Sequence, residues 1–499
     1  TLGGSGAVGS GAGSTVTIES GATLAAGNSI GTLTVDGDLI IRDGARLEVE
    51  VNPSGNESDH VRVTGNTALA GGAVAHVGAT GEYDLSSRYT ILSTQGSLTG
   101  SFASVTSDFA FLDPYLFYDY ELGTVDLAFL RNDRSLTSVA QTPNQIATAG
   151  GIDSIGFGSG NAVYDAVIQL ADDPSLIRDT FDALSGEVHA SVASSLIEDS
   201  RFVREAAQDR VRSAFHASPG IASELSHSSD LWARGFGSWE TRDSNGNAAD
   251  FDRSIGGVMV GADMRSSDSL LGVLTGYSRS DVSIGSRHSS ADIESYTLGG
   301  YGGVQWQRVV LQGAAAHTSN SIATKRSVAV PGLTDRLTGD YRAGVFQAFG
   351  ELGYRMPFER GVLEPFAGVA NINVDRKAST ESGGRAALAV QNENSDTTFT
   401  FLGTRAERRS VMRGIDAVFS GMLLWRHAFG DTDPESAHAF SDSSIFTVFG
   451  TPIARDSAVI AAGARFDFSR TTRLAVEYSG HIASGVEDHG LRLTLNKTL

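Results

Sequence analysis

The sequence predicts a mainly β protein, in which an antiparallel outer-membrane β-barrel holds an α-helix in its lumen and follows a stack of short strands. Three observations favour this fold. Residues 231–499 alternate apolar and polar side chains, residues 190–212 combine helical spacing with small and charged side chains all round, and residues 1–130 hold short strands between glycine turns. No run approaches the ~20 apolar residues that a membrane-spanning helix needs.

Composition narrows the function classes. The chain has 499 residues, 59 glycines, no cysteine and a formal net charge of -20. Without cysteine it has no disulfide, thiolate nucleophile or cysteine-bound metal, and its acidity argues against nucleic-acid binding. The 11 histidines are scattered without i,i+4 pairing on a helix, so no metal or other cofactor is expected. The chain begins at Thr1 without a signal peptide, so we expect a C-terminal piece of a longer protein or a processed one.

The first block, residues 1–135, predicts the stacked rungs of a β-solenoid. Its short strands arrive at near-regular spacing. The apolar residues that alternate with polar ones are Leu33 and Val35, Leu39 and Ile41, and Leu47, Val49 and Val51. We expect a late aromatic group to close the last rung: Phe102, Phe109, Phe111, Tyr115, Phe117, Tyr118, Tyr120 and Phe129. A small independent β-sandwich is the alternative.

The second block, residues 136–215, begins with a predicted joint. Pro143, Gly150-Gly151 and residues 156–160 favour a flexible segment. Asn161 and Asp173 are predicted N-caps of the helical segments that follow.

The end of the second block is a helix of unusual composition. From Ala190 it is small and polar, and it then becomes densely charged, so it cannot bury one apolar face in an ordinary core. It suits the inside of a water-filled polar tube. The alternative is a solvated helix held by i,i+4 ion pairs such as Arg201 with Glu205.

The third block, residues 216–499, predicts about twelve barrel strands. They begin near Leu231, Arg253, Leu270, Tyr296, Val309, Tyr341, Gly361, Thr397, Ile415, Val459, Arg473 and Gly490. In the last strand Leu491, Leu493 and Leu495 lie opposite Arg492, Thr494 and Asn496. Tight turns alternate with long polar connections such as residues 243–250 and 430–444, which is typical of an outer-membrane barrel with its apolar face outside. A soluble β-sandwich is the alternative.

Six segments, taken in order, resemble the C-terminal portion of classical (type V) autotransporters. GNSIGTL at 27–33 resembles the start of the autochaperone region, and ALSGEVHAS at 183–191 with DSRF at 199–202 resembles the pore-spanning helix. WARGFG at 232–237 resembles the first barrel strand, and YSG at 478–480 with HGL at 489–491 resembles the closing hairpin. The resemblance covers essentially the whole chain.

The resemblance implies an architecture, a function and partners. It implies the end of a right-handed parallel β-helix with an autochaperone region at 1–135, a linker and pore-spanning helix at 136–215, and a twelve-stranded translocator barrel at 216–499. Such a protein is an outer-membrane translocator and anchor that secretes and displays its own N-terminal passenger at the cell surface, with the stem assisting passenger folding. The implied partners of a monomeric barrel are outer-membrane lipid, the barrel-assembly machinery, periplasmic chaperones and the Sec translocon.

The resemblance also implies site residues. The pore helix carries Ser194, Ser195, Glu198, Asp199, Arg201, Arg204 and Glu205, and the assembly signal consists of Leu491, Leu493, Leu495 and Leu499. Family members usually end in Phe or Trp, whereas this chain ends in Leu499. Candidate lumenal partners of the helix are Asp416, Arg426, Arg465, Asp467 and Glu477; ordinary solvated lining is the alternative.

Catalysis by this chain is not expected. GSGAVG at 4–9 matches G-x-G-x-x-G but has no strand before it and no helix after it, and the sequence contains no G-x-S-x-G elbow, P-loop or H-E-x-x-H. Self-cleavage inside the pore, which some autotransporters use, needs an Asn within the helix, and Asn161 precedes it. The alternative function is an autotransporter enzyme, such as an outer-membrane esterase, whose catalytic domain lies upstream. A plain porin has no need of the charged helix.

Overall fold

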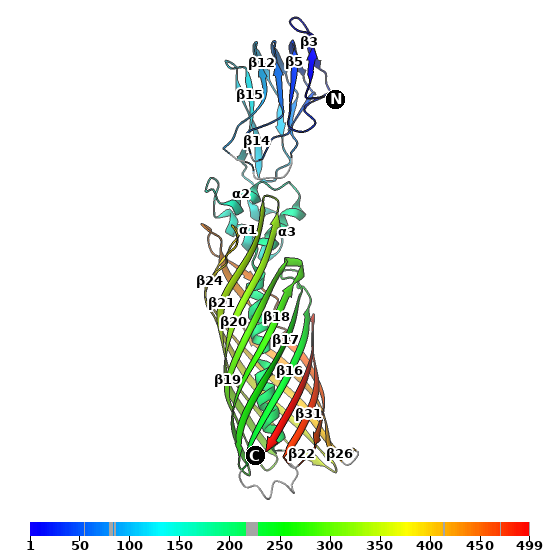
Figure 1. Cartoon of the computed structure of the whole chain (residues 1–499), viewed down its shortest axis with the longest axis vertical. Coiled ribbons are helices and arrows are strands. Elements are labelled where there is room, and N and C mark those ends of the chain that lie inside the picture. Colours follow the sequence, from blue (N-terminus) through cyan, green and yellow to red (C-terminus); the bar gives the residue numbers. More distant parts are fainter. Residues whose placement is uncertain are drawn as a thin grey trace.

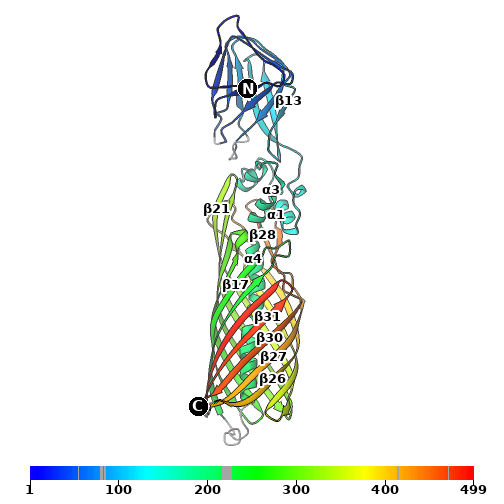
Figure 2. The same ribbon diagram turned by 90° about the vertical axis from the view of Figure 1, so that its right-hand side faces the viewer.

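The computed structural model describes residues 1–53, 55–78, 83, 86–215, 228–412, 415–469 and 471–498. Three parts follow one another along the long axis (Figure 1): a stem of strands, a group of short helices, and a barrel through which further helices run. The view at right angles shows the same order, with the last strand of the barrel ending far from the stem (Figure 2). We call the two ends of the barrel the stem end and the terminal end.

The stem is a β-solenoid, because successive strands join three parallel sheets in rotation. The sheets have the orders β1-β4-β7-β10-β13, β2-β5-β8-β11 and β3-β6-β9-β12, and a hairpin of β14 and β15 extends the second sheet beyond β11. The strands are β1 (Leu2–Gly4), β2 (Ala7–Gly9), β3 (Thr15–Ile18), β4 (Thr23–Ala26), β5 (Thr32–Asp36), β6 (Asp38–Arg42), β7 (Arg46–Val49), β8 (His60–Val63), β9 (Thr67–Ala70), β10 (Ala73–His76), β11 (Tyr89–Thr94), β12 (Leu98–Ser101), β13 (Ser104–Thr106), β14 (Leu112–Asp119) and β15 (Thr124–Arg131).

The core of the stem takes every second side chain of its strands. Leu33 is 1% exposed, and Val35 and Leu39 are fully buried. Parallel pairing stacks like residues on successive rungs, so Val35 of β5 lies in register with Val63 of β8. The predicted solenoid is confirmed, and the alternative of a small sandwich is wrong.

The eight aromatic residues at the base of the stem differ in burial, and Phe109 and Tyr118 are half-buried. Buried are Phe102, Phe111 and Phe129; exposed are Tyr115, Phe117 and Tyr120. The prediction that all of them cover the last rung is therefore wrong for the exposed group. The reason is local, because β14 alternates and turns only every second side chain towards the core.

His76 lies at the end of β10 within a buried aromatic cluster. Its ring centroid is 4.8 Å from that of Phe129 and 5.4 Å from that of Phe109. Its Nδ1 is 3.2 Å from the hydroxyl of Ser107. Burial, opposed by the nearby Asp108, lowers the pKa of His76 to about 4.

We expect the stem to lose stability as the pH falls from about 6.5 towards 4, because the unfolded chain then binds a proton at His76 and the folded stem does not. At about pH 5, which is about 1.5 units below the pKa of His76 in the unfolded chain, the loss is about 2 kcal/mol, because each unit corresponds to about 1.4 kcal/mol. His76→Phe suits the aromatic neighbours and should remove this part of the pH dependence. The measurement is the urea concentration at which the stem loses protease resistance, at neutral and acidic pH. Equal pH sensitivity in both proteins would contradict the prediction.

Three helices connect the stem to the barrel: α1 (Pro143–Asp153), α2 (Ala162–Ile168) and α3 (Pro174–Leu184), after a short 3₁₀ turn, η1 (Leu136–Ser138). The prediction of a flexible joint at Pro143 and Gly150-Gly151 is wrong, because these residues lie in α1. Thr142 and Gln145 form a reciprocal capping box around Pro143 at the first helical position. Gly151 is needed for packing, since a Cβ there would lie 2.4 Å from the ring of Phe446.

The two predicted N-caps are confirmed. The side chain of Asn161 accepts from the N–H groups of Val163 and Tyr164 at the start of α2. Asp173 caps α3 in the same way, with Pro174 at the first helical position.

Twelve long antiparallel strands close into a barrel, as predicted. They are β16 (Ser228–Arg242), β17 (Phe251–Arg265), β18 (Ser269–Ile284), β19 (Ser289–Trp306), β20 (Val309–Val330), β21 (Leu333–Tyr354), β23 (Gly361–Arg376), β26 (Glu393–Met412), β27 (Ile415–Gly430), β30 (Asp456–Asp467), β31 (Thr472–Ala483) and β32 (Val486–Thr498). The three-residue β22 (Met356–Phe358) continues β21 along β23. The first strand pairs with the last, from Asp230 with Thr498 to Arg242 with Val486, which closes the sheet.

Two predicted strand starts are late. Tyr296 and Tyr341 lie well inside β19 and β21, which begin at Ser289 and Leu333. These strands extend towards the stem end with polar outward residues such as Arg336 and Asp340, which are exposed, so the apolar alternation fades before the strand does. A short 3₁₀ turn, η2 (Gly285–Arg287), precedes β19.

The described connections at the terminal end are short, whereas the stem end has long connections as well as tight turns at residues 331–332 and 484–485. Tight turns at residues 307–308 and 359–360 lie at the terminal end. The long connections at 243–250 and 431–455 lie at the stem end, where β24 (Ser379–Thr380), β25 (Ala389–Val390), β28 (Glu435–Ala439) and β29 (Phe446–Phe449) form a small sheet of their own.

The outer face of the barrel is apolar and the inner face is polar. On β32, Leu491, Leu493 and Leu495 are 52%, 51% and 48% exposed, whereas Arg492 and Asn496 point into the lumen and are 4% and 7% exposed. This is the inverse of a soluble barrel, so the alternative of a soluble sandwich is wrong. Within the described ranges, no helix has the length and apolar character needed to cross a membrane.

Candidate functional site: the lumenal helices

Two helices, α4 (Glu187–Asp199) and α5 (Arg201–Phe215), run through the barrel (Figures 1 and 2). With the residue between them they rise about 43 Å at 1.5 Å per residue, which exceeds the ~30 Å of a bilayer core. α4 begins after Gly186, whose φ is 72°. A Cβ there would also lie 2.4 Å from Leu388, so this turn into the lumen requires glycine.

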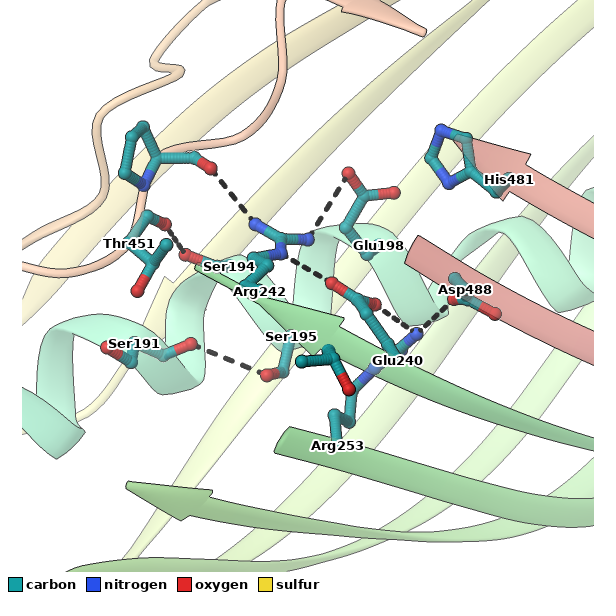
Figure 3. Close-up of polar contacts among 12 residues, drawn as sticks. Ser191, Ser194, Ser195, Glu198, Glu240, Arg242, Arg253, Thr451, His481 and Asp488 are labelled. Atoms are coloured by element: carbon teal, nitrogen blue, oxygen red, sulfur yellow. Dashed lines mark hydrogen bonds and ion pairs between the residues drawn. The ribbon is translucent and has the colours of Figure 1, made fainter. Parts of the chain in front are cut away.

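Small side chains allow the wall to approach α4 closely. Ser191 and Ser194 are fully buried and Ser195 is 1% exposed. Ser194 donates to the carbonyl of Thr451 at 2.6 Å, and Ser195 to the carbonyl of Ser191 at 3.4 Å (Figure 3). A Cβ at Gly450 would lie 2.6 Å from the backbone nitrogen of Ser191. The connection between β27 and β30 therefore folds back directly onto the helix.

Glu198 lies at the centre of a buried cluster of charges (Figure 3). Its two carboxylate oxygens accept from Arg426 at 2.7 and 2.9 Å, and Arg242 is 3.7 Å away. Arg242 also donates to Glu240, which lies 2.5 Å from Arg253. These residues come from α4, β16, β17 and β27, so one network joins the helix to two parts of the wall that β30, β31 and β32 separate.

The same network continues to the residues after Glu198. Asp199 pairs with Arg253, and Arg201 donates to Asp488 at 2.6 Å. Asp488, 1% exposed, also accepts from Arg253 at 2.8 Å and from Ser238. Removing one member of such a network strands a buried charge, which costs about 3–5 kcal/mol.

The next turn of helix makes separate contacts. Arg204 donates to Gln347 at 3.1 Å and to Ser200 at 2.7 Å. Glu205 pairs with Arg492, which also pairs with Glu477. Glu205 therefore pairs with the wall and not with Arg201, contrary to the ion pair of the solvated-helix alternative.

At the terminal end, Arg210 fixes α5 to the wall. It lies 2.5 Å from Asp230 and 2.6 Å from Asp263. Tyr301 donates to Asp263 at 2.7 Å and accepts from the indole of Trp232 at 2.6 Å. Trp232, within the first-strand motif, thus points inward and supports the anchor of the helix.

At the stem end, Glu381 holds another charged contact. Its carboxylate accepts two hydrogen bonds from Arg326, at 2.8 and 2.7 Å, and lies 2.9 Å from Nε2 of His189 on α4. Burial opposes the charge of Glu381, but Arg326 and His189 outweigh it and hold the pKa of this carboxyl well below its usual range. Glu381 therefore stays ionised at the mouth of the barrel.

Of the predicted lumenal partners, the structure brings Arg426 to Glu198, whereas Glu477 meets the helix only through Arg492. Arg465 lies 3.5 Å from Asp467, and Asp416 is exposed. Sequence reasoning missed a set that contacts the helix: Arg242, Arg253, Asp488 and Gln347. The alternation along the strand was the available signal, because Arg242 lies an even number of residues from Trp232 on β16 and therefore on the same, inward face.

The predicted assembly residues Leu491, Leu493 and Leu495 lie on the outer face of β32, and Leu499 lies outside the described residues. Asn161, the residue weighed for self-cleavage, caps α2 near the stem end and donates to the carbonyl of Ser441 at 2.8 Å. In the ranges that the structure describes, no group of three or more His, Asp or Glu is placed to hold a metal ion.

The arrangement is that of two helices held inside the barrel by polar contacts with its wall. The charged side chains of the helices pair with opposite charges of the wall. The small side chains of α4 let the connection between β27 and β30 pack directly against the helix.

The barrel part of the chain is similar to known proteins. Residues 231–479 match the family described as "Autotransporter beta-domain". An "Extracellular serine protease" of Serratia marcescens is 28% identical over 95% of this chain, which spans 49% of the relative's length. The chain thus covers about half of the curated relatives that it matches.

Among solved structures, the translocator domain of the autotransporter NalP from Neisseria meningitidis is similar with a TM-score of 0.49 and 14% identity, covering 62% of this chain and 99% of that one. The beta domain of the Bordetella autotransporter Brka has a TM-score of 0.43 and 20% identity, covering 55% of this chain and 100% of that one.

Proposed function

We infer, from the autotransporter beta-domain that residues 231–479 form, that this chain is the translocator and membrane anchor of a type V secretion protein. The barrel lies in the bacterial outer membrane as a monomer and translocates a passenger. The observation that carries the inference is the occupied lumen, in which a polar wall holds helices that are connected to the stem through α1, α2 and α3.

We propose a division of labour along the chain. Residues 1–135 end the passenger's β-helix and assist its folding, residues 136–215 link it to the barrel and plug the pore, and residues 216–499 translocate and anchor. Support for the first role is the stacked apolar core of the stem, because an ordered rung is a template on which the next rung can pair. Support for the second is the set of contacts made by Ser194, Ser195, Glu198, Asp199, Arg201, Arg204 and Glu205.

The proposed partners follow from this route. A chain that crosses two membranes and folds outside needs the Sec translocon, periplasmic chaperones and the barrel-assembly machinery. We propose that the last of these recognises Leu491, Leu493, Leu495 and Leu499. The outward leucine row of β32 supports this choice, because it borders the seam where the barrel closes.

A second proposal concerns the passenger. The identity to an extracellular serine protease over nearly the whole chain favours an upstream passenger with protease activity. The barrel part remains a transport domain under this proposal, and the enzyme lies before Thr1. The proposed protease passenger hydrolyses a peptide bond, whereas the esterase alternative hydrolyses an ester bond.

The test is a fusion of a signal peptide and a cysteine-free reporter before Thr1, expressed in a Gram-negative host. We expect the reporter to be digested by protease added to intact cells while the barrel resists. A reporter that stays protected in cells with a folded barrel would contradict the translocator function.

The proposed role of the stem in passenger folding is tested with two single aspartate substitutions on β5. Val35→Asp buries a carboxylate in the solenoid core and should cost about 3 kcal/mol or more, leaving the displayed reporter unfolded. Thr32→Asp places the same charge on the exposed side of β5 and serves as the control. If both variants display an equally folded reporter, the stem does not assist folding.

A further inference from the structure

The lumen contains a cavity of about 120 Å³ beside α5, towards the terminal end. On the other side the helix touches the wall, since a Cβ at Gly303 of β19 would lie 2.4 Å from Val211. Facing the cavity, the wall carries small side chains such as Ser420, Ala461 and Gly463. The helix therefore lies off-centre, and the space is left along β27, β30 and β31.

Arginine dominates the charged lining of this cavity. The six arginines are Arg210, Arg212, Arg234, Arg405, Arg465 and Arg492, from α5, β16, β26, β30 and β32. The acidic residues of the lining are Asp209, Glu407 and Glu477. Asp209 is shared, because both Arg212 and Arg234 pair with it.

Several of these guanidinium groups have N–H donors left over. Among the arginines of this lining, four buried guanidinium nitrogens have no hydrogen-bond partner in the described structure: Nη1 of Arg234, Nη1 of Arg405, Nε of Arg492, and Nε of Arg465, which lies 3.5 Å from Asp467. Arg234, Arg405 and Arg492 are 5%, 7% and 4% exposed, so their guanidinium groups are shielded from bulk solvent. A buried charged donor without an acceptor is costly, and an acceptor in the cavity removes that cost.

We propose that this cavity binds a small tetrahedral oxyanion, such as inorganic phosphate or sulfate. The planar fork of a guanidinium group matches the oxygens of such anions, and several forks from different strands converge here. The barrel wall separates the cavity from the bilayer, so the anion comes from solution and not from a lipid headgroup. Bound there, it connects Arg212 of α5 with Arg234 and Arg465 of the wall and holds the helix in the plugged position.

The experiment titrates the full chain, purified in a zwitterionic detergent at low ionic strength, with inorganic phosphate by calorimetry and ³¹P NMR. We expect saturable binding of one phosphate, competition by sulfate and little effect of nitrate. Arg465→Gln removes an incompletely paired guanidinium and should raise Kd about tenfold. Arg279→Gln removes an exposed arginine of the outer face, 52% exposed, and should leave Kd unchanged.

Heat-modifiable mobility in gels checks that each variant is folded, and Arg212→Gln provides a second lining variant if Arg465→Gln does not fold. Linear, unsaturable uptake of phosphate by the folded wild type overturns the proposal. Equal loss of binding in Arg279→Gln overturns it as well, because the charge of the whole protein is then responsible. Displacement of phosphate by phosphatidic acid in the micelle, but not by sulfate, overturns the assignment to a free anion.

Discussion

A barrel that begins at residue 216, and so lacks the stem and both lumenal helices, is expected to conduct ions on the order of tenfold better than the full chain in planar bilayers, because water replaces the plug. The two helices occupy the lumen along its whole length, and their polar contacts with the wall run from Glu381 beside His189 at the stem end to Asp263 beside Arg210 at the terminal end. Water then solvates the wall charges that lose their helix partners, so we expect the twelve strands to keep the barrel shape around an open lumen.

Excising only residues 187–215 is a weaker test. The stem and the start of β16 lie at opposite ends of the barrel (Figure 1). Any chain that connects them still passes through the lumen and obstructs it. The truncation avoids this obstruction, and the measured quantity is single-channel conductance together with its lifetime.

Glu198→Gln in the full chain is the matched control. It keeps the helix in place but removes the carboxylate that accepts from Arg426, so we expect conductance to stay low while unfolding costs about 3 kcal/mol less. A truncated barrel that conducts no better than the full chain would show that the loops at the stem end, and not the helix, close the pore.

The predictability of the fold followed the strength of its periodicity. The rows of Leu33 and Val35, and of Leu491, Leu493 and Leu495, are visible because each strand has one buried or lipid-facing side. Periodicity did not predict the local structure where capping and packing contacts determine it. Gly150-Gly151 belongs to a helix, because the capping box of Thr142 and Gln145 starts it and Gly151 must lie against Phe446.

The lumenal site was harder to predict than the fold. The charged helix indicated which residues need partners, but pairing across a lumen depends on strand stagger, which the sequence does not state. Glu198 meets Arg426 of β27 and lies near Arg242 of β16, strands that are distant in the chain. The alternation of a strand predicts which of its side chains face the lumen. The position of each charge along the barrel axis depends on the register between neighbouring strands.

A carboxylate at the centre of the outer face should have the second large effect. Leu493 of β32 faces outward, 51% exposed, opposite Gly235 on β16 and Val476 on β31. Leu493→Asp places a charge in the hydrocarbon region at a cost of about 2 kcal/mol. We expect several-fold less heat-modifiable, folded barrel both in cells and after refolding into phosphatidylcholine vesicles.

Asn496→Asp is the control that separates the two faces of the same strand. It adds the same charge, but inward, where the side chain of Asn496 already accepts from Arg210 at 3.4 Å. Its yield should match that of the unaltered chain, and an equal loss in both variants would mean that the strand tolerates no charge on either face.

Comparing the two measurements of Leu493→Asp separates membrane energetics from recognition. Refolding into pure lipid reports only the cost of the buried carboxylate, whereas assembly in cells also depends on how β32 is recognised. Leu493→Phe keeps the outward face apolar and should refold as well as the unaltered chain. If the leucine row is also the assembly signal, Leu493→Asp must lose more in cells than in vesicles, because the machinery then meets an altered signal as well as a less stable strand.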